Sequence, residues 1–200
     1  MNKETRTYRS DLKLRADGDN EPGKVSGYAA VFNSESEDMG WWTEVREIIA
    51  PGAFDDADMS DVRALFNHDS NMLLARTSSG TLQLSIDKTG LKYEFELPDT
   101  TVGRDLRELL RRGDVSQSSF GFTVKKQSWS EEKDERGEVI RMVRTIEKID
   151  RLFDVSPVTY PAYPDTQVAL RSLEQWKAEH NKVEQKEKTP LRDAAEALII

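Results

Sequence analysis

Two neighbouring apolar segments in the middle of the chain most constrain its fold. Thr81–Asp87 and Leu91–Leu97 alternate apolar with polar residues, which is the pattern of a β-strand with one buried face. Lys88–Gly90 supplies the turn between them, and its glycine suits a positive φ. The two segments therefore predict an antiparallel hairpin that serves as scaffold.

Other segments favour further strands and a single well-defined helix within the same part of the chain. Lys24–Asn33 and Trp42–Ala50 are rich in β-prone apolar residues and each predicts a strand. Between Val102 and Arg112, leucines recur at helical spacing, with Thr101 as the expected cap and Gly113 as the stop. The expected fold class is mainly β with a few helices (α+β).

Length and polarity suggest one folded domain with polar ends. The 200 residues are 36% hydrophobic and 33% charged, more polar than a compact globule of this length. We expect a flexible arm over residues 1–22, with at most a short strand at Tyr8–Leu14, and a folded domain over residues 23–168. Residues 169–200 are expected to form a helical, partly disordered tail, because their apolar stripe is thin.

Charge and cysteine content narrow the function classes. A net charge of −8 argues against nucleic acid as a partner, since a phosphate backbone favours basic surfaces. The sequence has no apolar run of 18 residues and no signal-like start, so we expect neither membrane insertion nor export. The absence of cysteine excludes disulfides, thiolate catalysis and cysteine-bound zinc. A cytoplasmic setting fits this composition.

A serine-rich strand is predicted directly after the helix, within Gly113–Phe122. Strand alternation places Ser116 and Ser118 on the side of the phenylalanines and Ser119 on the opposite side. A small hydroxyl facing away from the aromatic layer, with Gly121 nearby to allow close approach, suits a nucleophile in a cleft. It equally suits an ordinary strand serine facing solvent.

Asp61–Asp69 contains one of the two histidines of the chain. Alternation places His68 at the end of an extended segment, in line with an apolar row. The imidazole could be half-buried with a structural hydrogen bond, or it could act as a base. The other histidine, His180, lies among charged residues and receives no role.

Asp154 lies in the middle of an apolar strand, where an unpaired carboxylate would be costly to bury. It therefore needs a cationic or N–H partner. One of the many arginines could provide a salt bridge, and an imidazole would also serve.

Four segments follow one another in a recognisable order: Val62–Asp69 with its Asn-His-Asp, the hairpin before Leu97-Pro98, Arg112–Phe122, and Phe153–Ala162. Together they resemble the prohead maturation proteases of tailed bacteriophages, which are similar in fold to the herpesvirus assemblins. The resemblance covers residues 24–168. It implies a herpesvirus-protease-like fold, which is a closed or partly closed antiparallel β-barrel surrounded by helices, with a C-terminal helical tail.

The resemblance implies a serine endopeptidase with Ser119 as the nucleophile and His68 as the base. Assemblins use a second histidine as the third member, and this chain has none at the matching place. Asp154 is assigned to that role because it lies in the matching strand, with Glu147 and Asp150 as weaker candidates. Backbone N–H groups near Ser119 are expected to hold the oxyanion.

The same resemblance implies the setting. Capsid and scaffold proteins are the expected substrates, together with the chain itself, inside the assembling procapsid in the host cell cytoplasm. Assemblins act as dimers, but the sequence shows no recognisable dimer surface, so self-association is left open. The C-terminal tail is expected to attach the protease to scaffold or capsid and to be trimmed by self-cleavage. No cofactor, nucleic acid or membrane is implied.

Two other interpretations of the same residues remain. A non-catalytic scaffolding or capsid-binding module would have Ser119 facing solvent and Asp154 paired with arginine. A metal-dependent hydrolase would use His68 and Asp69 as ligands, but one usable histidine and no cysteine make a poor donor set.

Overall fold

The computed structural model describes residues 3–8, 12–15, 23–40 and 43–160, in which β-strands predominate. The chain divides into two units, residues 1–165 and 166–200, and all described residues lie in the first. The elements, in chain order, are β1 (Glu4–Tyr8), β2 (Lys13–Arg15), β3 (Lys24–Val31), β4 (Glu44–Ile49), β5 (Arg63–Phe66), β6 (Asp69–Arg76), the 3-10 turn η1 (Thr77–Ser79), β7 (Leu82–Ile86), β8 (Gly90–Glu96), α1 (Thr101–Arg112), β9 (Gln117–Lys133) and β10 (Val139–Val158).

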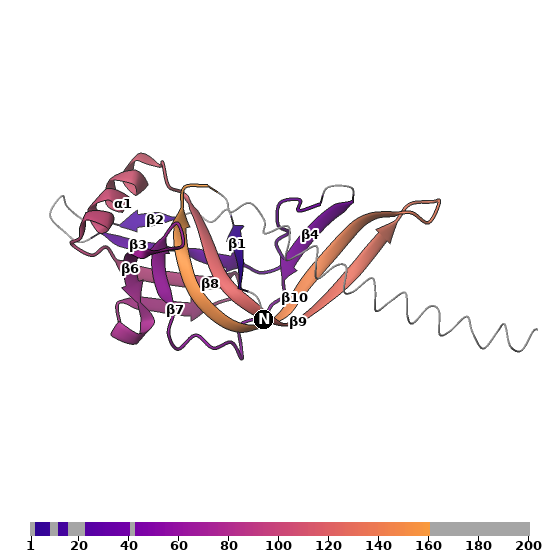
Figure 1. The fold of residues 1–200 in the computed structure, drawn as a ribbon, viewed down its shortest axis with the longest axis horizontal. Helices are drawn as coiled ribbons and strands as arrows, with labels where there is room; N and C mark the ends of the chain where they lie inside the picture. The colour runs from indigo at the N-terminus through magenta and orange to yellow at the C-terminus, as the bar shows by residue number, and fades with distance from the viewer. Residues whose placement is uncertain (1–2, 9–11, 16–22, 41–42, 161–200) are drawn as a thin grey trace, which may run out of the picture. The chain divides into compact units, whose positions relative to one another are not determined.

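The larger sheet is built on the long strands β9 and β10, which bend together (Figure 1). Its order is β1-β9-β10-β5-β6, and β4 also pairs with β10. β10 runs parallel to both β4 and β5, so this sheet is mixed and differs at β10 from the antiparallel barrel that was expected. Long stretches of chain separate β4 and β5 from β10, and such connections permit parallel pairing. The herpesvirus-protease-like barrel stays a prediction.

The smaller sheet has the order β2-β3-β8-β7 and contains the predicted hairpin. β7 and β8 pair antiparallel from Leu82↔Phe95 to Ile86↔Leu91, which confirms the hairpin. The positive φ expected at Gly90 is wrong, because Gly90 is not among the residues with positive φ. A side chain there would instead collide with the carbonyl oxygen of Ala30, so the glycine allows β3 and β8 to approach closely.

The core lies where the two sheets face each other and is rich in aromatic rings. Phe120 stacks on Phe122 with ring centroids 4.5 Å apart, and Phe54 packs against Phe120 at 6.0 Å. Ser118 is fully buried on this side and its hydroxyl lies 2.8 Å from the hydroxyl of Tyr93 on β8. The predicted side of Ser118 is therefore confirmed.

Helix α1 begins one residue earlier than expected. Its N-cap is Thr100, whose side chain accepts a hydrogen bond from the N–H of Gly103. Gly113 ends the helix with φ 80°, and its N–H donates to the last turn, as predicted. The helix thus delivers the chain directly into β9.

The N-terminal residues differ from the flexible arm that was expected. β1 pairs with β9 along its whole length, and the side chains of Glu4 and Arg6 are almost completely buried. They join Glu47 and Arg144 in a cluster of two acids and two arginines, here called the four-charge cluster. A charged sequence therefore forms a strand because its charges are compensated inside the sheet.

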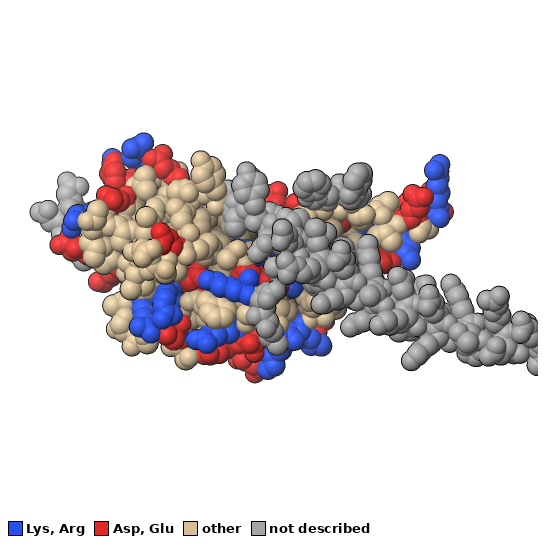
Figure 2. Space-filling view, viewed as in Figure 1, with Lys and Arg blue, Asp and Glu red and all other residues tan. Residues whose placement is uncertain are grey.

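The boundaries predicted for the folded domain and the tail stay predictions. The expected tail helix and His180 lie outside the described residues. On the face shown in Figure 2, acidic and basic side chains are interspersed and neither sign dominates. Among the described residues, no helix is long and apolar enough to cross a membrane.

Candidate active site

Ser119 lies on β9 of the larger sheet, between β1 and β10. It is opposite Thr7 of β1 on one side and opposite Ser156 of β10 on the other. Its side chain points away from the phenylalanine core and is fully buried. Strand alternation therefore predicted the direction of the Ser119 side chain. It did not predict its burial, to which the neighbouring strand β1 contributes.

His68 lies in the two-residue turn between β5 and β6. Asn67 and His68 have φ of 54° and 60°, and Phe66 pairs with Asp69 across the turn. Two consecutive positive φ values are the mark of a type I′ hairpin turn, in which asparagine is favoured. The extended conformation predicted for His68 is therefore wrong. The turn aims the ring across β10 towards β9.

Asp154 lies on β10, between the strands that carry the other two groups. Its Oδ1 accepts hydrogen bonds from His68 Nδ1 and, at 3.0 Å, from the hydroxyl of Ser156. Its Oδ2 accepts a 2.7 Å hydrogen bond from the ammonium group of Lys3. Gly121 provides the space, because a Cβ there would lie 2.5 Å from Oδ2 of Asp154.

The three predicted side chains therefore meet, and we call them the Ser119 cluster: Ser119, His68 and Asp154. Nε2 of His68 is 2.6 Å from Oγ of Ser119, while Nδ1 of the same ring contacts the carboxylate. The bond to an ionised carboxylate fixes a proton on Nδ1 and leaves Nε2 free to accept one. This arrangement can activate a hydroxyl as a nucleophile.

Ser119 has a second partner, the carbonyl oxygen of Arg6 on β1. The hydroxyl donates to that oxygen at 2.9 Å. A hydroxyl has a single proton, so the carbonyl of Arg6 and Nε2 of His68 compete for it.

The charge of Asp154 is held by its partners. Burial by itself raises the pKa of this carboxyl, but the hydrogen bonds and charges of His68 and Lys3 outweigh burial, and the net pKa is lowered. The carboxyl is therefore ionised at neutral pH.

The remaining candidates lie elsewhere. Glu147 forms a 2.5 Å ion pair with Lys126, and Asp150 accepts a 3.4 Å hydrogen bond from Thr123. Asp69 follows His68 in the chain, but its carboxylate accepts from the backbone N–H of Asn71. Across the residues that the structure describes, no three or more histidine and carboxylate side chains gather as metal ligands would.

Sequence reasoning missed Lys3, Ser156 and the carbonyl of Arg6. Ser156 carried a usable signal, because it is two residues from Asp154 and therefore on the same face of the strand. Lys3 carried none, since its place depends on the pairing of β1 with β9, far apart in the chain.

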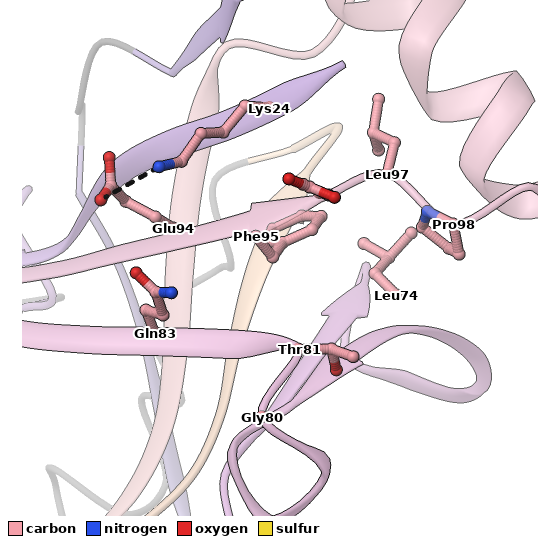
Figure 3. A pocket seen from close by; sticks show the side chains of 10 residues that line it. Lys24, Leu74, Gly80, Thr81, Gln83, Glu94, Phe95, Leu97 and Pro98 are labelled. Carbon is pink, nitrogen blue, oxygen red and sulfur yellow. Dashed lines mark ion pairs between the residues drawn. The ribbon is translucent and has the colours of Figure 1, made fainter. Parts of the chain in front are cut away.

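The structure also contains a cavity of about 440 Å³, whose lining side chains are drawn in Figure 3. Its lining includes Leu74 of β6, Gln83 of β7 and Phe95 of β8, and none of the three cluster residues borders it. A hydrogen-bonded, pre-oriented set of groups is better evidence for chemistry than volume, so we place the candidate site at Ser119.

A serine, an imidazole and a carboxylate in one hydrogen-bonded row form the arrangement that serine hydrolases use on several unrelated folds. The model of one family, described as Caudovirus prohead serine protease, matches residues 10–180. The chain belongs to this family, and at the family level it is a serine protease with a role in the phage prohead. Comparisons with curated proteins and with solved structures found no match.

Proposed function

We propose that this chain is a phage prohead serine endopeptidase in which Ser119 attacks the peptide, His68 is the base and Asp154 orients the imidazole. One observation carries the proposal. The hydroxyl of Ser119, both ring nitrogens of His68 and the carboxylate of Asp154 form a continuous row of hydrogen bonds. Membership of the prohead protease family supports the same assignment.

The chemistry follows from this row. Oγ of Ser119 bonds to the peptide carbonyl carbon as its proton passes to Nε2 of His68. The imidazolium then protonates the leaving amine, the C–N bond breaks, and an acyl-enzyme remains. Water repeats the sequence and releases the acid. Asp154 keeps the proton of the ring on Nδ1 throughout and stabilises the imidazolium.

The proposed substrates are segments of scaffold and capsid proteins, and the chain itself, inside the procapsid that assembles in the host cell cytoplasm. This reaction requires no cofactor. Backbone N–H groups near Ser119 and Gly121 are the proposed oxyanion donors. Self-association at high local concentration belongs to the same proposal.

A fluorophosphonate probe tests the nucleophile. The full chain, alone and mixed with its scaffold and capsid proteins, should become labelled at Ser119, and labelling should survive a chelator. Ser119→Ala should abolish labelling. Ser118→Ala is the matched control, because its buried hydroxyl contacts Tyr93 on the opposite side of the strand.

Two results would contradict the proposal. Labelling of Ser119→Ala at the wild-type rate would assign the reactive group to another residue. A folded wild-type chain that stays unlabelled even with scaffold and capsid present would favour the non-catalytic binding module.

Self-cleavage is tested separately by mass spectrometry of the purified chain. We expect the C-terminal tail to be lost with time in the wild type and retained in Ser119→Ala. Loss of the tail in both would mean that another protease removes it.

A further inference from the structure

The position of the His68 ring depends on a turn at the end of an irregular hairpin. The pairing of β5 with β6 shifts register between Ala64 and Leu65 and again between Leu65 and Phe66. Such irregularities bend the strand, so the regular strand pairing does not by itself set where the turn lies. Additional contacts must therefore hold the ring opposite Ser119.

Asn67 makes these contacts. Its backbone N–H donates to the carbonyl oxygen of Pro157 at 3.0 Å. Its side-chain Oδ1 accepts from the N–H of Thr159 at 2.9 Å and from the hydroxyl of Thr159 at 3.2 Å. Three hydrogen bonds thus join one turn residue to the end of β10.

The part of β10 that holds Asn67 is also the part that pairs with the nucleophile strand. Ser156 is opposite Ser119, and Pro157 is opposite Ser118. The same segment of β10 backbone therefore positions both the turn and the strand that carries Ser119. The hydrogen bonds between Asn67 and Thr159 thus help to set the distance between His68 and Ser119.

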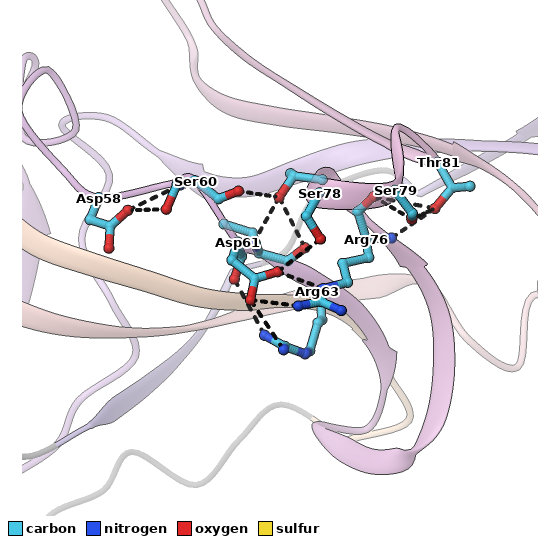
Figure 4. A network of polar contacts seen from close by, with 10 residues as sticks. Asp58, Ser60, Asp61, Arg63, Arg76, Ser78, Ser79 and Thr81 are labelled. Atoms are coloured by element: carbon cyan, nitrogen blue, oxygen red, sulfur yellow. Dashed lines mark hydrogen bonds and ion pairs between the residues drawn. The ribbon is translucent and has the colours of Figure 1, made fainter.

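The other end of the hairpin is held by a different network, shown in Figure 4. Asp61 accepts two hydrogen bonds from the guanidinium of Arg76, at 2.5 and 2.8 Å. These side chains are 28% and 40% exposed and lie at the open end of the hairpin, away from the turn. They hold the hairpin together but do not fix the ring.

We propose that Asn67 is a positioning residue whose side-chain carbonyl, bonded to Thr159, holds the imidazole of His68 in reach of Ser119. The inference rests on the proposed function and deepens it by assigning a residue that contacts neither substrate nor reacting atoms. Asn67 has two separable properties, tolerance of positive φ and an acceptor for Thr159.

Two substitutions separate these properties. Asn67→Gly keeps the turn conformation and removes the acceptor, whereas Asn67→Asp keeps both. We expect Asn67→Gly to lower kcat for a peptide substrate by about 10- to 100-fold with little change in KM, since small misplacements of a catalytic group cost this much. Asn67→Asp should stay within about threefold of the wild type, because both carboxylate oxygens can accept from Thr159.

Asn33→Gly is the matched control. Asn33 also has a positive φ, 53°, in a turn outside the Ser119 cluster. Thermal unfolding of all three variants shows whether they fold, and Asn33→Gly should leave kcat unchanged. In proton NMR, the imidazole N–H bonded to Asp154 should give a low-field resonance in the wild type, Asn67→Asp and Asn33→Gly. This resonance should be absent in Asn67→Gly.

The outcomes distinguish the two proposals. If Ser119→Ala is inactive while Asn67→Gly has wild-type kcat and keeps the resonance, the positioning role is wrong and the proposed function stands. If Asn67→Gly and Asn33→Gly lower kcat equally, the effect is general and the positioning role is again wrong. If Ser119→Ala remains active, the proposed function fails, and the resonance alone then decides whether Asn67 holds the ring.

Discussion

The larger sheet holds two groups of buried or partly buried charged and polar side chains that differ in what they can do. In the four-charge cluster, Arg144 lies 2.7 Å from Glu4 and 2.8 Å from Glu47, and Arg6 lies 2.7 Å from Glu47. None of these side chains is more than 5% exposed. In the Ser119 cluster, one carboxylate faces an imidazole that in turn faces a hydroxyl.

The two groups differ in whether one of their members can gain or lose a proton near neutral pH. A guanidinium keeps its charge at every relevant pH, so two arginines and two ionised carboxylates balance at neutral pH and hold strands together. An imidazole gains or loses a proton near neutrality, so the row that contains it can transfer one. β1 joins the two groups, because Arg6 provides a side chain to one and a carbonyl to the other.

The largest expected effect separates activity from stability at the Ser119 cluster. Ser119→Ala and His68→Ala should each lower kcat by about 10⁴-fold or more, as for members of other catalytic triads. Ser119→Ala should hardly alter the thermal midpoint, since it removes one oxygen atom. His68→Ala also removes a hydrogen-bond partner of the buried Asp154 and should lower the midpoint. Peptide cleavage assays and calorimetry on the same samples check this, and a stable variant with near wild-type kcat would contradict it.

Breaking the four-charge cluster should do the reverse. Arg144→Met leaves two buried carboxylates with too few cations and should lower the free energy of unfolding by about 3–5 kcal/mol. Arg111→Met is the control, because Arg111 pairs with Glu108 on the exposed face of α1 and such pairs contribute about 1 kcal/mol or less. Denaturant titration measures both. Equal effects would mean that the cluster does not hold β1.

Acid should weaken both groups. The pKa of Glu4 is raised by burial but lowered overall by Arg144 and Arg6, and the pKa of Asp154 is also lowered overall. Each carboxyl therefore adds stability above its ordinary pKa, 4.5 and 3.8, and loses it as pH falls through the lower value of the folded state.

We expect the free energy of unfolding to fall steeply below about pH 4. The slope should be reduced in Asp154→Asn, which no longer titrates at that position. Unfolding curves from pH 7 to pH 2 check this, and an unchanged slope in Asp154→Asn would contradict the role of its charge.

The smallest expected effect is that of Lys3. Its side chain is 45% exposed, so water screens its ion pair with Asp154 and Lys3→Met should cost about 1 kcal/mol of stability or less. Without Lys3 the pKa of Asp154 should rise, so activity should decline at a higher pH on the acid side. A pH–rate profile measures the shift, and a shift towards lower pH would be the wrong sign.

Local patterns decided what could be predicted from the sequence. The β7–β8 hairpin, the end of α1 at Gly113 and the side on which Ser118 lies all follow from spacing within a few residues. The resemblance then selected Ser119, His68 and Asp154, which the structure brings together, while their catalytic roles stay predictions.

What could not be predicted depends on distant pairing. His68 and Asp154 are 86 residues apart in the chain, and their contact requires β5 to lie parallel to β10. The charged residues before Tyr8 suggested a flexible arm because their partners, Glu47 and Arg144, lie on distant strands. The turn at His68 was missed because apolar alternation hides the preference of Asn67 for positive φ.

The carbonyl of Arg6 acts as an internal competitor of every substrate, because it already binds the hydroxyl of Ser119. Ser119 is fully buried and its hydroxyl donates to this carbonyl, so under the proposed function the contact must break before a peptide can react. The apparent dissociation constant of a substrate is its intrinsic value divided by the fraction of molecules in which this contact is broken, so the apparent affinity falls. Cleavage of dilute targets would then be slow, and cleavage would become efficient where targets are crowded together, as they are inside a closed shell.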